Sequence, residues 1–195
     1  ASPTLTLAVS PAGSVTLPDK VTLTATLLGA VPDVSGKEIK FTGGGTTVTI
    51  TTDSSGKAVY TPANLASGTH KFGASFEGDL DNDPVSATEI TGYTVNPRTQ
   101  AALTLNGLGS AYTYGCEAFS LSTSGGSGRG AVSYTSSDPS VASVTGDTVT
   151  ILKAGTFTIT ATKDGDSSYA EKSVTSGEVT ASEATPNVNL SATGG

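Results

Sequence analysis

Apolar and polar residues alternate along much of this chain, with the period of two that is typical of a half-buried β-strand. In residues 4–9 and 20–27 every second position is apolar: Leu5, Leu7 and Val9, then Val21, Leu23, Ala25 and Leu27. Similar runs follow at 38–41, 47–51, 57–61, 102–105, 132–135, 148–151 and 172–180. No stretch shows helical periodicity over three turns. The pattern predicts an all-β chain.

One strand-like stretch occurs twice, eighty-seven residues apart. Residues 65–79 and 152–166 both read Leu-x-x-Gly-Thr-x4-Ala-x3-Gly-Asp. In the second copy Phe157, Ile159 and Ala161 alternate with threonine, so we expect these three side chains to face inward. A period of this size is that of a whole domain, because solenoid units are shorter. The repeat predicts two β-sandwiches, each built around one copy.

The position of Pro97 and a repeated motif near the end of the chain predict where these domains lie. We expect a first domain at 1–97 and a second at 98–184, joined at 96–99 by a short, stiff link that contains Pro97. Residues 185–191 echo residues 2–8, and two interpretations are open. Either 185–195 begin a further repeat that is cut short, which we favour, or they form a strand-like tail by chance.

Composition narrows the choice of partners. The net charge of −7 is shared by the two halves, since residues 1–97 contribute −4 and residues 98–195 contribute −3. With no basic patch, we expect neither nucleic acid nor anionic membranes as partners. No apolar run approaches the ~18 residues of a membrane span. A single Cys excludes an internal disulfide, and the lack of a signal peptide suggests a fragment or a matured piece.

The residues that follow the predicted Gly/Ser loop at 124–130 resemble a known family. Residues 134–144, 149–156 and 159–162, with Asp138-Pro139 at a turn, are similar to bacterial immunoglobulin-like domains of group 2. The first domain resembles another, group 3-like set of these domains, through Gly56-Lys57-Ala58 and the first copy of the repeat. Together the resemblance covers nearly the whole chain and implies two tandem immunoglobulin-like β-sandwiches.

The resemblance also implies a role. Such domains recur in adhesins and other extracellular proteins, especially of Gram-positive bacteria, so we expect an extracellular or cell-surface location. We expect a monomeric, non-catalytic stalk or spacer, with neighbouring repeats of the same chain as its partners. The alternative is a module that binds host protein or carbohydrate, or an accessory domain of an extracellular hydrolase. Four tyrosines are candidates for stacking on sugars, although tryptophan is absent: Tyr112, Tyr114, Tyr134 and Tyr169.

Four carboxylates form the one candidate metal site. Glu77, Asp79, Asp81 and Asp83 occupy alternate positions in a loop, and calcium prefers clusters of oxygen ligands in such places. The Gly and terminal Glu of an EF-hand loop are missing, however. The same alternation also fits a solvated strand edge, so calcium is a candidate ligand and no other cofactor is expected.

Two single residues invite chemical interpretations. Cys116 is a candidate thioester or redox thiol, but Gln100 has nothing in the sequence to place it beside the thiol, and lone cysteines are commonly buried and inert. His70 aligns with Phe157 and is expected at the edge of the core. With one His in the chain, neither a two-His metal site nor a Ser-His-Asp triad is indicated.

Two further hypotheses rest on short motifs. Lys20 and Asn96, with Glu38 as the acid, are conceivable partners in an intramolecular isopeptide bond, although a Lys at the start of a strand is usually exposed. The loop 125–130 is rich in glycine and contains Arg129, which suggests phosphate binding. Loops of that kind normally precede a helix. None is predicted here, so we favour a mobile hairpin loop.

Overall fold

The computed structural model describes residues 1–185, and within them it contains twenty β-strands and no helix. The chain divides into two compact units, one of residues 1–98 with 167–169 and one of 99–166 with the residues from 170 onward. The all-β prediction is confirmed. The further repeat predicted at 185–195 lies, apart from Thr185, outside the described residues.

The first unit is a sandwich of two sheets. One sheet has the order β1-β3-β6 and the other β2-β9-β7-β4-β5, with the short β8 paired to β7. This is the strand order of an immunoglobulin-like sandwich, in which the chain crosses between the sheets. The strands are β1 (Thr4–Ser10), β2 (Ser14–Thr16), β3 (Thr22–Leu28), β4 (Glu38–Gly43), β5 (Thr46–Thr51), β6 (Lys57–Tyr60), β7 (Gly68–Phe76), β8 (Val85–Ser86) and β9 (Ile90–Asn96).

The second unit repeats this arrangement with shorter, interrupted strands. They are β10 (Leu103–Asn106), β11 (Ala111–Thr113), β12 (Phe119–Ser120), β13 (Ser122–Gly125), β14 (Val132–Ser136), β15 (Ala142–Thr145), β16 (Thr148–Ile151), β17 (Gly155–Phe157), β18 (Ile159–Lys163), β19 (Lys172–Thr175) and β20 (Val179–Ser182). Their pairings give β10-β13, β12-β16-β15, β11-β20-β17 and β14-β18-β19. Because β12 continues into β13, β17 into β18, and β19 leads on to β20, these pairings make two layers.

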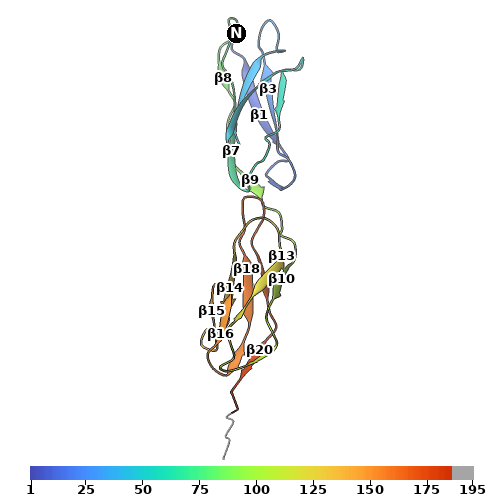
Figure 1. Ribbon diagram of the computed structural model, residues 1–195. Helices are drawn as coiled ribbons and strands as arrows, with labels where there is room; N and C mark the ends of the chain where they lie inside the picture. The colour runs from blue at the N-terminus through green and yellow to red at the C-terminus, as the bar shows by residue number, and fades with distance from the viewer. Residues whose placement is uncertain (186–195) are drawn as a thin grey trace, which may run out of the picture. The chain divides into compact units, whose positions relative to one another are not determined.

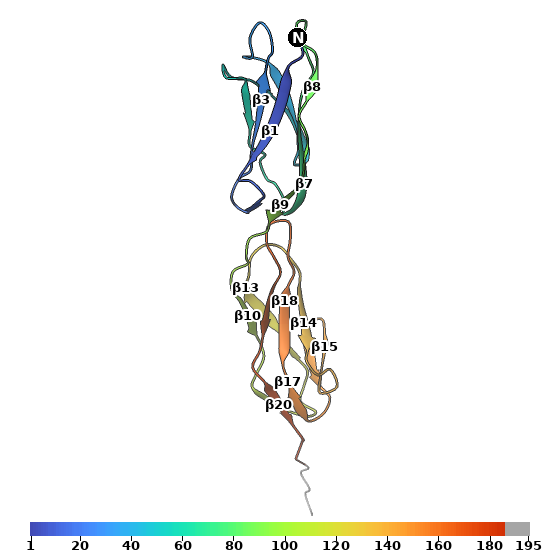
Figure 2. The same ribbon diagram turned by 180° about the vertical axis from the view of Figure 1, so that it is seen from behind.

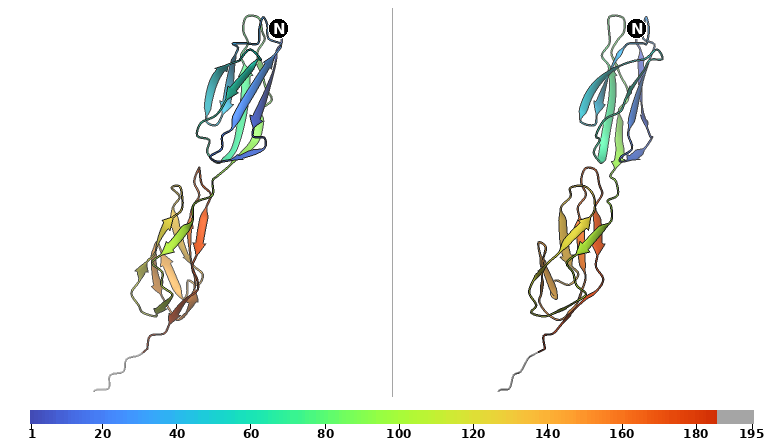
Figure 3. Two further views of the ribbon diagram at one scale, coloured as in Figure 1. Left: turned by 90° about the vertical axis from the view of Figure 1, so that its right-hand side faces the viewer. Right: turned by 45° about the vertical axis from the view of Figure 1, so that its right-hand side comes forward.

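The alternation in the sequence accounts for the core of each unit. Val21, Leu23, Ala25 and Leu27 are all buried, and they pack against residues of the facing sheet such as Phe41. In the second unit Phe157, Ile159 and Ala161 are buried as predicted. The side view in Figure 3 shows the strands of each sandwich running lengthwise.

The strands of the second unit are interrupted at positions that the alternation in the sequence does not predict. Leu121 interrupts a strand between β12 and β13, yet its side chain is buried and its N–H reaches the Asp147 carbonyl at 2.8 Å. The loop predicted at 124–130 begins two residues later, because Ser124 and Gly125 belong to β13 and pair with β10. Gly125 has φ of 78°, which ends that strand.

Each sandwich carries the chain from one end to the other. In the first, the start of β1 pairs with the end of β3, whereas the end of β9 pairs with the end of β2. Figure 1 shows the N-terminus at one end of this sandwich and β9 at its other end. In the second, β20 runs parallel to β11 and leads to the end from which the chain leaves (Figure 2).

Candidate functional site

Three loops of the first unit gather at the end that holds the N-terminus. They are residues 29–37 between β3 and β4, 52–56 between β5 and β6, and 77–84 between β7 and β8. The pairing of the strands brings these loops to the same end. Leu28 at the end of β3 pairs with Thr4 at the start of β1, and Phe76 at the end of β7 pairs with Ile39 near the start of β4. We call these residues the three-loop surface. Loops at one end of such a sandwich are a common place for binding.

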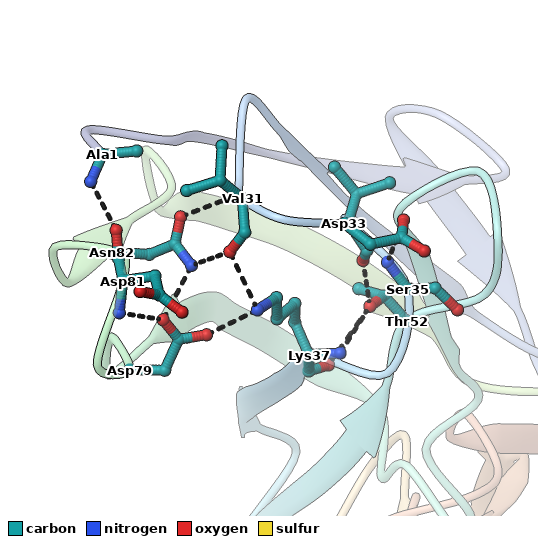
Figure 4. Close-up of polar contacts among 10 residues, drawn as sticks. Ala1, Val31, Asp33, Ser35, Lys37, Thr52, Asp79, Asp81 and Asn82 are labelled. Atoms are coloured by element: carbon teal, nitrogen blue, oxygen red, sulfur yellow. Dashed lines mark hydrogen bonds and ion pairs between the residues drawn. The ribbon is translucent and has the colours of Figure 1, made fainter.

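Asn82 joins two of these loops. Its side chain is 5% exposed, and its amide nitrogen donates to the Val31 carbonyl and to Asp79 Oδ1, each at 2.7 Å. Its carbonyl oxygen accepts the Val31 N–H at 2.8 Å (Figure 4). The backbone N–H and carbonyl of a loop residue usually lack a neighbouring strand to pair with. The Asn82 carboxamide supplies both hydrogen bonds to Val31 in place of such a strand.

Asp79 and Lys37 form an ion pair beside Asn82. Lys37 Nζ lies 2.6 Å from Asp79 Oδ2, and the two side chains are 15% and 33% exposed. Asp79 Oδ1 also accepts the N–H of Asp81 at 3.0 Å. The hydrogen bond from Lys37, followed by those from the Asn82 amide and the Asp81 N–H, lowers the pKa of Asp79 to about 2. Asp79 is therefore ionised at neutral pH and bound to three donors.

Thr52 connects the third loop. Its hydroxyl donates to the Val34 carbonyl at 2.6 Å and accepts the Lys37 N–H at 2.9 Å, and the residue is buried. The next residue, Asp53, closes its own turn by accepting the N–H groups of Ser55 and Lys57, and its pKa is lowered chiefly by the Ser55 hydroxyl. All three loops are thus held by hydrogen bonds.

The outside of this surface carries apolar side chains. Leu80 is 104% exposed at the tip of the loop 77–84, and Val31 is 44% exposed on the loop 29–37. Single exposed apolar residues are ordinary. Here, however, the loop that presents Leu80 is fixed on one side by Asp79 and on the other by Asn82, so a partner would meet an ordered apolar tip.

The four predicted calcium ligands lie on this loop but make separate contacts. Glu77 is exposed, 4.0 Å from Lys40, and Asp79 pairs with Lys37. Asp83 accepts the Ser2 hydroxyl at 2.8 Å, and Asp81 is exposed. Across residues 1–185, no three or more His, Cys, Asp or Glu side chains are grouped so that they could hold a metal ion. Calcium binding stays a prediction.

The structure separates Cys116 from the residue proposed as its thioester partner. Cys116 is half-buried and packs against the second core. The Gln100 side chain is buried, and its amide nitrogen donates to the carbonyls of Asp164 and Ala170 at 3.0 and 2.8 Å. Its oxygen accepts the Ser127 N–H at 3.1 Å. Gln100 therefore fixes backbone near the loop 125–130, and the structure gives the thioester hypothesis no support.

His70 lies where the sequence predicted it, at the edge of the first core. Its ring is half-buried and stacked on Phe72 with 6.1 Å between centroids, and Nε2 lies 2.8 Å from the Ala66 carbonyl. Of the isopeptide candidates, Lys20 and Glu38 are exposed and Asn96 is half-buried. No hydrogen bond or ion pair joins these three residues within the described chain, so the structure gives that hypothesis no support.

The remaining candidates also have structural roles. Arg129 follows β13 in a loop with no helix after it, and its N–H donates to Asp166 Oδ2 at 2.7 Å. Tyr112 stacks on Phe119 at 4.3 Å, and its hydroxyl accepts the Gly109 N–H. Tyr134 packs against the second core, whereas Tyr114 is 50% exposed. Tyr112 and Tyr134 are thus occupied within the fold, which weakens the sugar-stacking hypothesis.

Sequence reasoning missed Asn82 and Thr52, which hold the three-loop surface together. Asn82 stands in Asp81-Asn82-Asp83-Pro84, which is a turn signal, and nothing in it points to Val31. Thr52 looks like one more strand threonine. The sequence gives one hint. Residues 79–84 read Asp-Leu-Asp-Asn-Asp-Pro, whereas the corresponding residues 166–169 read Asp-Ser-Ser-Tyr.

Comparison with known proteins gives only distant likenesses. No family model matches the chain, and no curated protein matches it. Among solved structures, a C-terminal 282-residue fragment of intimin in complex with the intimin-binding domain of its translocated receptor is 22% identical over 83% of this chain, with a TM-score of 0.31. Invasin, a bacterial integrin-binding protein, is 20% identical over 88%, with a TM-score of 0.46. A bacterial ice-binding adhesin is 16% identical over 94%, with a TM-score of 0.38.

This chain spans 58%, 38% and 65% of the length of those three structures. The fold assignment rests on the strand order of the two units and on their two cores. In the described part of the chain, no helix is long and apolar enough to cross a membrane. The chain is a tandem of two immunoglobulin-like β-sandwiches.

Proposed function

We propose that this chain is a non-catalytic spacer segment of an adhesin-type protein that is secreted or displayed on a bacterial surface. The observation that carries the proposal is the path of the chain, which enters each sandwich at one end and leaves it at the other. Such a path lets domains follow one another in series. A Gram-positive cell wall is an expectation of the sequence resemblance alone.

The candidate chemical sites support a non-catalytic role. Asp79 is neutralised by Lys37, Gln100 is bound to backbone carbonyls, and His70 is stacked on Phe72. These three side chains are therefore engaged in holding the fold, which supports the non-catalytic role proposed here. The intimin fragment, the invasin and the ice-binding adhesin among the similar structures support proposing a surface role for this chain.

Domain replacement tests the spacer role in the whole protein. In the protein that carries this chain, residues 1–184 are exchanged for two immunoglobulin-like sandwiches of unrelated sequence, and attachment of the bacterium to its target is measured. A spacer predicts that attachment is retained, while deletion of the same residues reduces it. Loss of attachment in the exchanged protein would show that this sequence itself recognises something.

One observation favours a second candidate, recognition of a protein by the three-loop surface. Leu80 is fully exposed on a loop whose backbone is fixed by Asp79 and Asn82, so binding there costs little conformational entropy. Leu80→Ser should leave thermal stability unchanged and weaken attachment if this surface binds. Val59→Thr, at an exposed valine within β6 that pairs with Thr24 away from the three loops, is the control. Equal attachment of Leu80→Ser and the parent would remove this candidate.

A further inference from the structure

The strand β5 forms a free edge of the larger sheet in the first sandwich. It pairs with β4 on one side, and within residues 1–185 no strand pairs with it on the other. An edge of this kind offers unpaired backbone groups to any extended chain that lies beside it. β1 and β5, with seven and six residues, are the longest edge strands of the described chain.

β5 lacks the features by which proteins usually protect such an edge. Those features are a charged side chain, a proline, a bulge or a very short strand. Residues 41–52 contain neither a charge nor a proline, and β5 pairs with β4 in unbroken register. The other long edge, β1, is bounded by Pro3 and Pro11. Of these two edges, β5 is therefore the one more open to a further strand.

Hydrogen bonds at the end of β5 show which of its residues face outward. The Thr52 N–H donates to the Lys37 carbonyl at 2.9 Å, and the Thr52 carbonyl accepts the Gly36 N–H at 2.9 Å. Both backbone groups of Thr52 therefore point toward the β4 side. Successive residues of a strand point these groups to opposite sides. Thr51 and every second residue before it in β5 thus direct the N–H and the carbonyl away from β4.

The sequence of β5 matches a second copy of itself. When two β5 strands lie antiparallel about a twofold axis at Thr49, Thr47 of each copy faces Thr51 of the other. The outward backbone groups of these threonines then bond to one another. In the same register Val48 faces Ile50, so the half-buried apolar side chains of both copies share one face and the exposed threonines share the other. A shift by one residue would place apolar side chains on the threonine face.

We propose that β5 is a self-association surface, through which two copies of this chain pair edge to edge into one continuous sheet. A second copy is the partner because β5 carries no charge that would select an oppositely charged chain, and because its own sequence matches both faces. One pair of strands is a smaller interface than a stable dimer needs, so free chains associate weakly. The inference goes beyond the spacer role and replaces the expectation of a monomer.

Sedimentation equilibrium of the full chain tests the self-association, over a range of concentration that reaches about 1 mM. The average mass of the parent should rise with concentration from 19.2 kDa toward twice that value. Thr49→Lys places like charges opposite each other on the twofold axis, so it should weaken association by about fivefold or more. Thr49 is exposed, so the melting temperature of the variant should stay that of the parent.

Thr6→Lys is the matched control, because Thr6 is an exposed threonine in β1, the other long edge strand. This variant has the same net charge as Thr49→Lys and should associate as the parent does. A parent that stays monomeric over the whole range would overturn the proposal. Equal association of Thr49→Lys and Thr6→Lys would overturn it as well.

A mixture of oppositely charged variants tests the register. Fluorescently labelled Thr49→Lys is titrated with Thr49→Glu and, in parallel, with Thr6→Glu, which has the same net charge. In the proposed register the new lysine faces the new glutamate, so Thr49→Glu should bind about fivefold more tightly than Thr6→Glu. Equal binding would overturn the register. These measurements involve no attachment target, so this inference and the proposed function fail separately.

Discussion

Asn82 and Val31 lie fifty-one positions apart in the chain, yet the carboxamide of one satisfies both backbone polar groups of the other. The N–H of Val31 donates to Oδ1 at 2.8 Å, and its carbonyl accepts from Nδ2 at 2.7 Å. A loop normally leaves such groups to water. This contact replaces a missing strand partner and fixes the three-loop surface.

Asn82→Ala should therefore destabilise the first sandwich. The substitution leaves the N–H and the carbonyl of Val31 without their side-chain partner and removes a donor to Asp79. Losing a buried hydrogen-bonding side chain of this kind costs ~2 kcal/mol. For a domain of this size the melting temperature should fall by about 10 °C, as measured by calorimetry. Asn106→Ala is the control, because Asn106 is exposed and its shortest side-chain bond is 3.2 Å. Equal melting of both variants would contradict the assigned role of Asn82.

The ion pair of Asp79 makes the first sandwich sensitive to acid. The pKa of Asp79 is lowered from an ordinary 3.8 to about 2. The ionised carboxylate therefore stabilises the fold fully at a pH above 3.8, and this stability is lost as the pH falls toward about 2. Denaturant unfolding across this window should show a steeper loss for the parent than for Asp79→Asn. Asp138→Asn is the control, since the lowered pKa of Asp138 belongs to the second sandwich. Parallel curves for the parent and Asp79→Asn would refute the assignment.

Gly56 is required by its surroundings, which explains the Gly56-Lys57-Ala58 motif of the sequence resemblance. Its φ is 76°, and a Cβ placed there would collide with the Leu27 carbonyl oxygen. Gly36 has a similar φ of 68° with nothing near its missing Cβ. Gly36→Ala should cost only the ~1 kcal/mol of left-handed backbone strain, and Gly56→Ala clearly more. Chemical denaturation compares them, and equal losses would disprove the steric explanation.

The sequence could predict what depends on local alternation. Leu23 and Ile159 are buried because every second residue of their strands is apolar, and that pattern needs no knowledge of neighbours. It could not predict the parallel pairing of β2 with β9, which joins residues eighty positions apart. Nor could it predict Asn82, because a carboxamide in a turn sequence gives no indication of its distant partner. The site depends on contacts between loops, which no period in the sequence records.

The measurement that tests the spacer account most directly is a thermal-shift panel on the full chain with calcium, with EDTA and with soluble glycans. A ligand present at a hundred times its Kd stabilises a binding domain by ~2.7 kcal/mol, on the order of 10 °C for a domain of this size. The account predicts that neither melting transition moves, since Asp79 is already paired with Lys37 and the Tyr112 ring is already stacked. A rise with calcium that Asp81→Asn abolishes would make the loop 77–84 a structural metal site. A rise with any glycan would contradict the spacer account and make this chain a binding module.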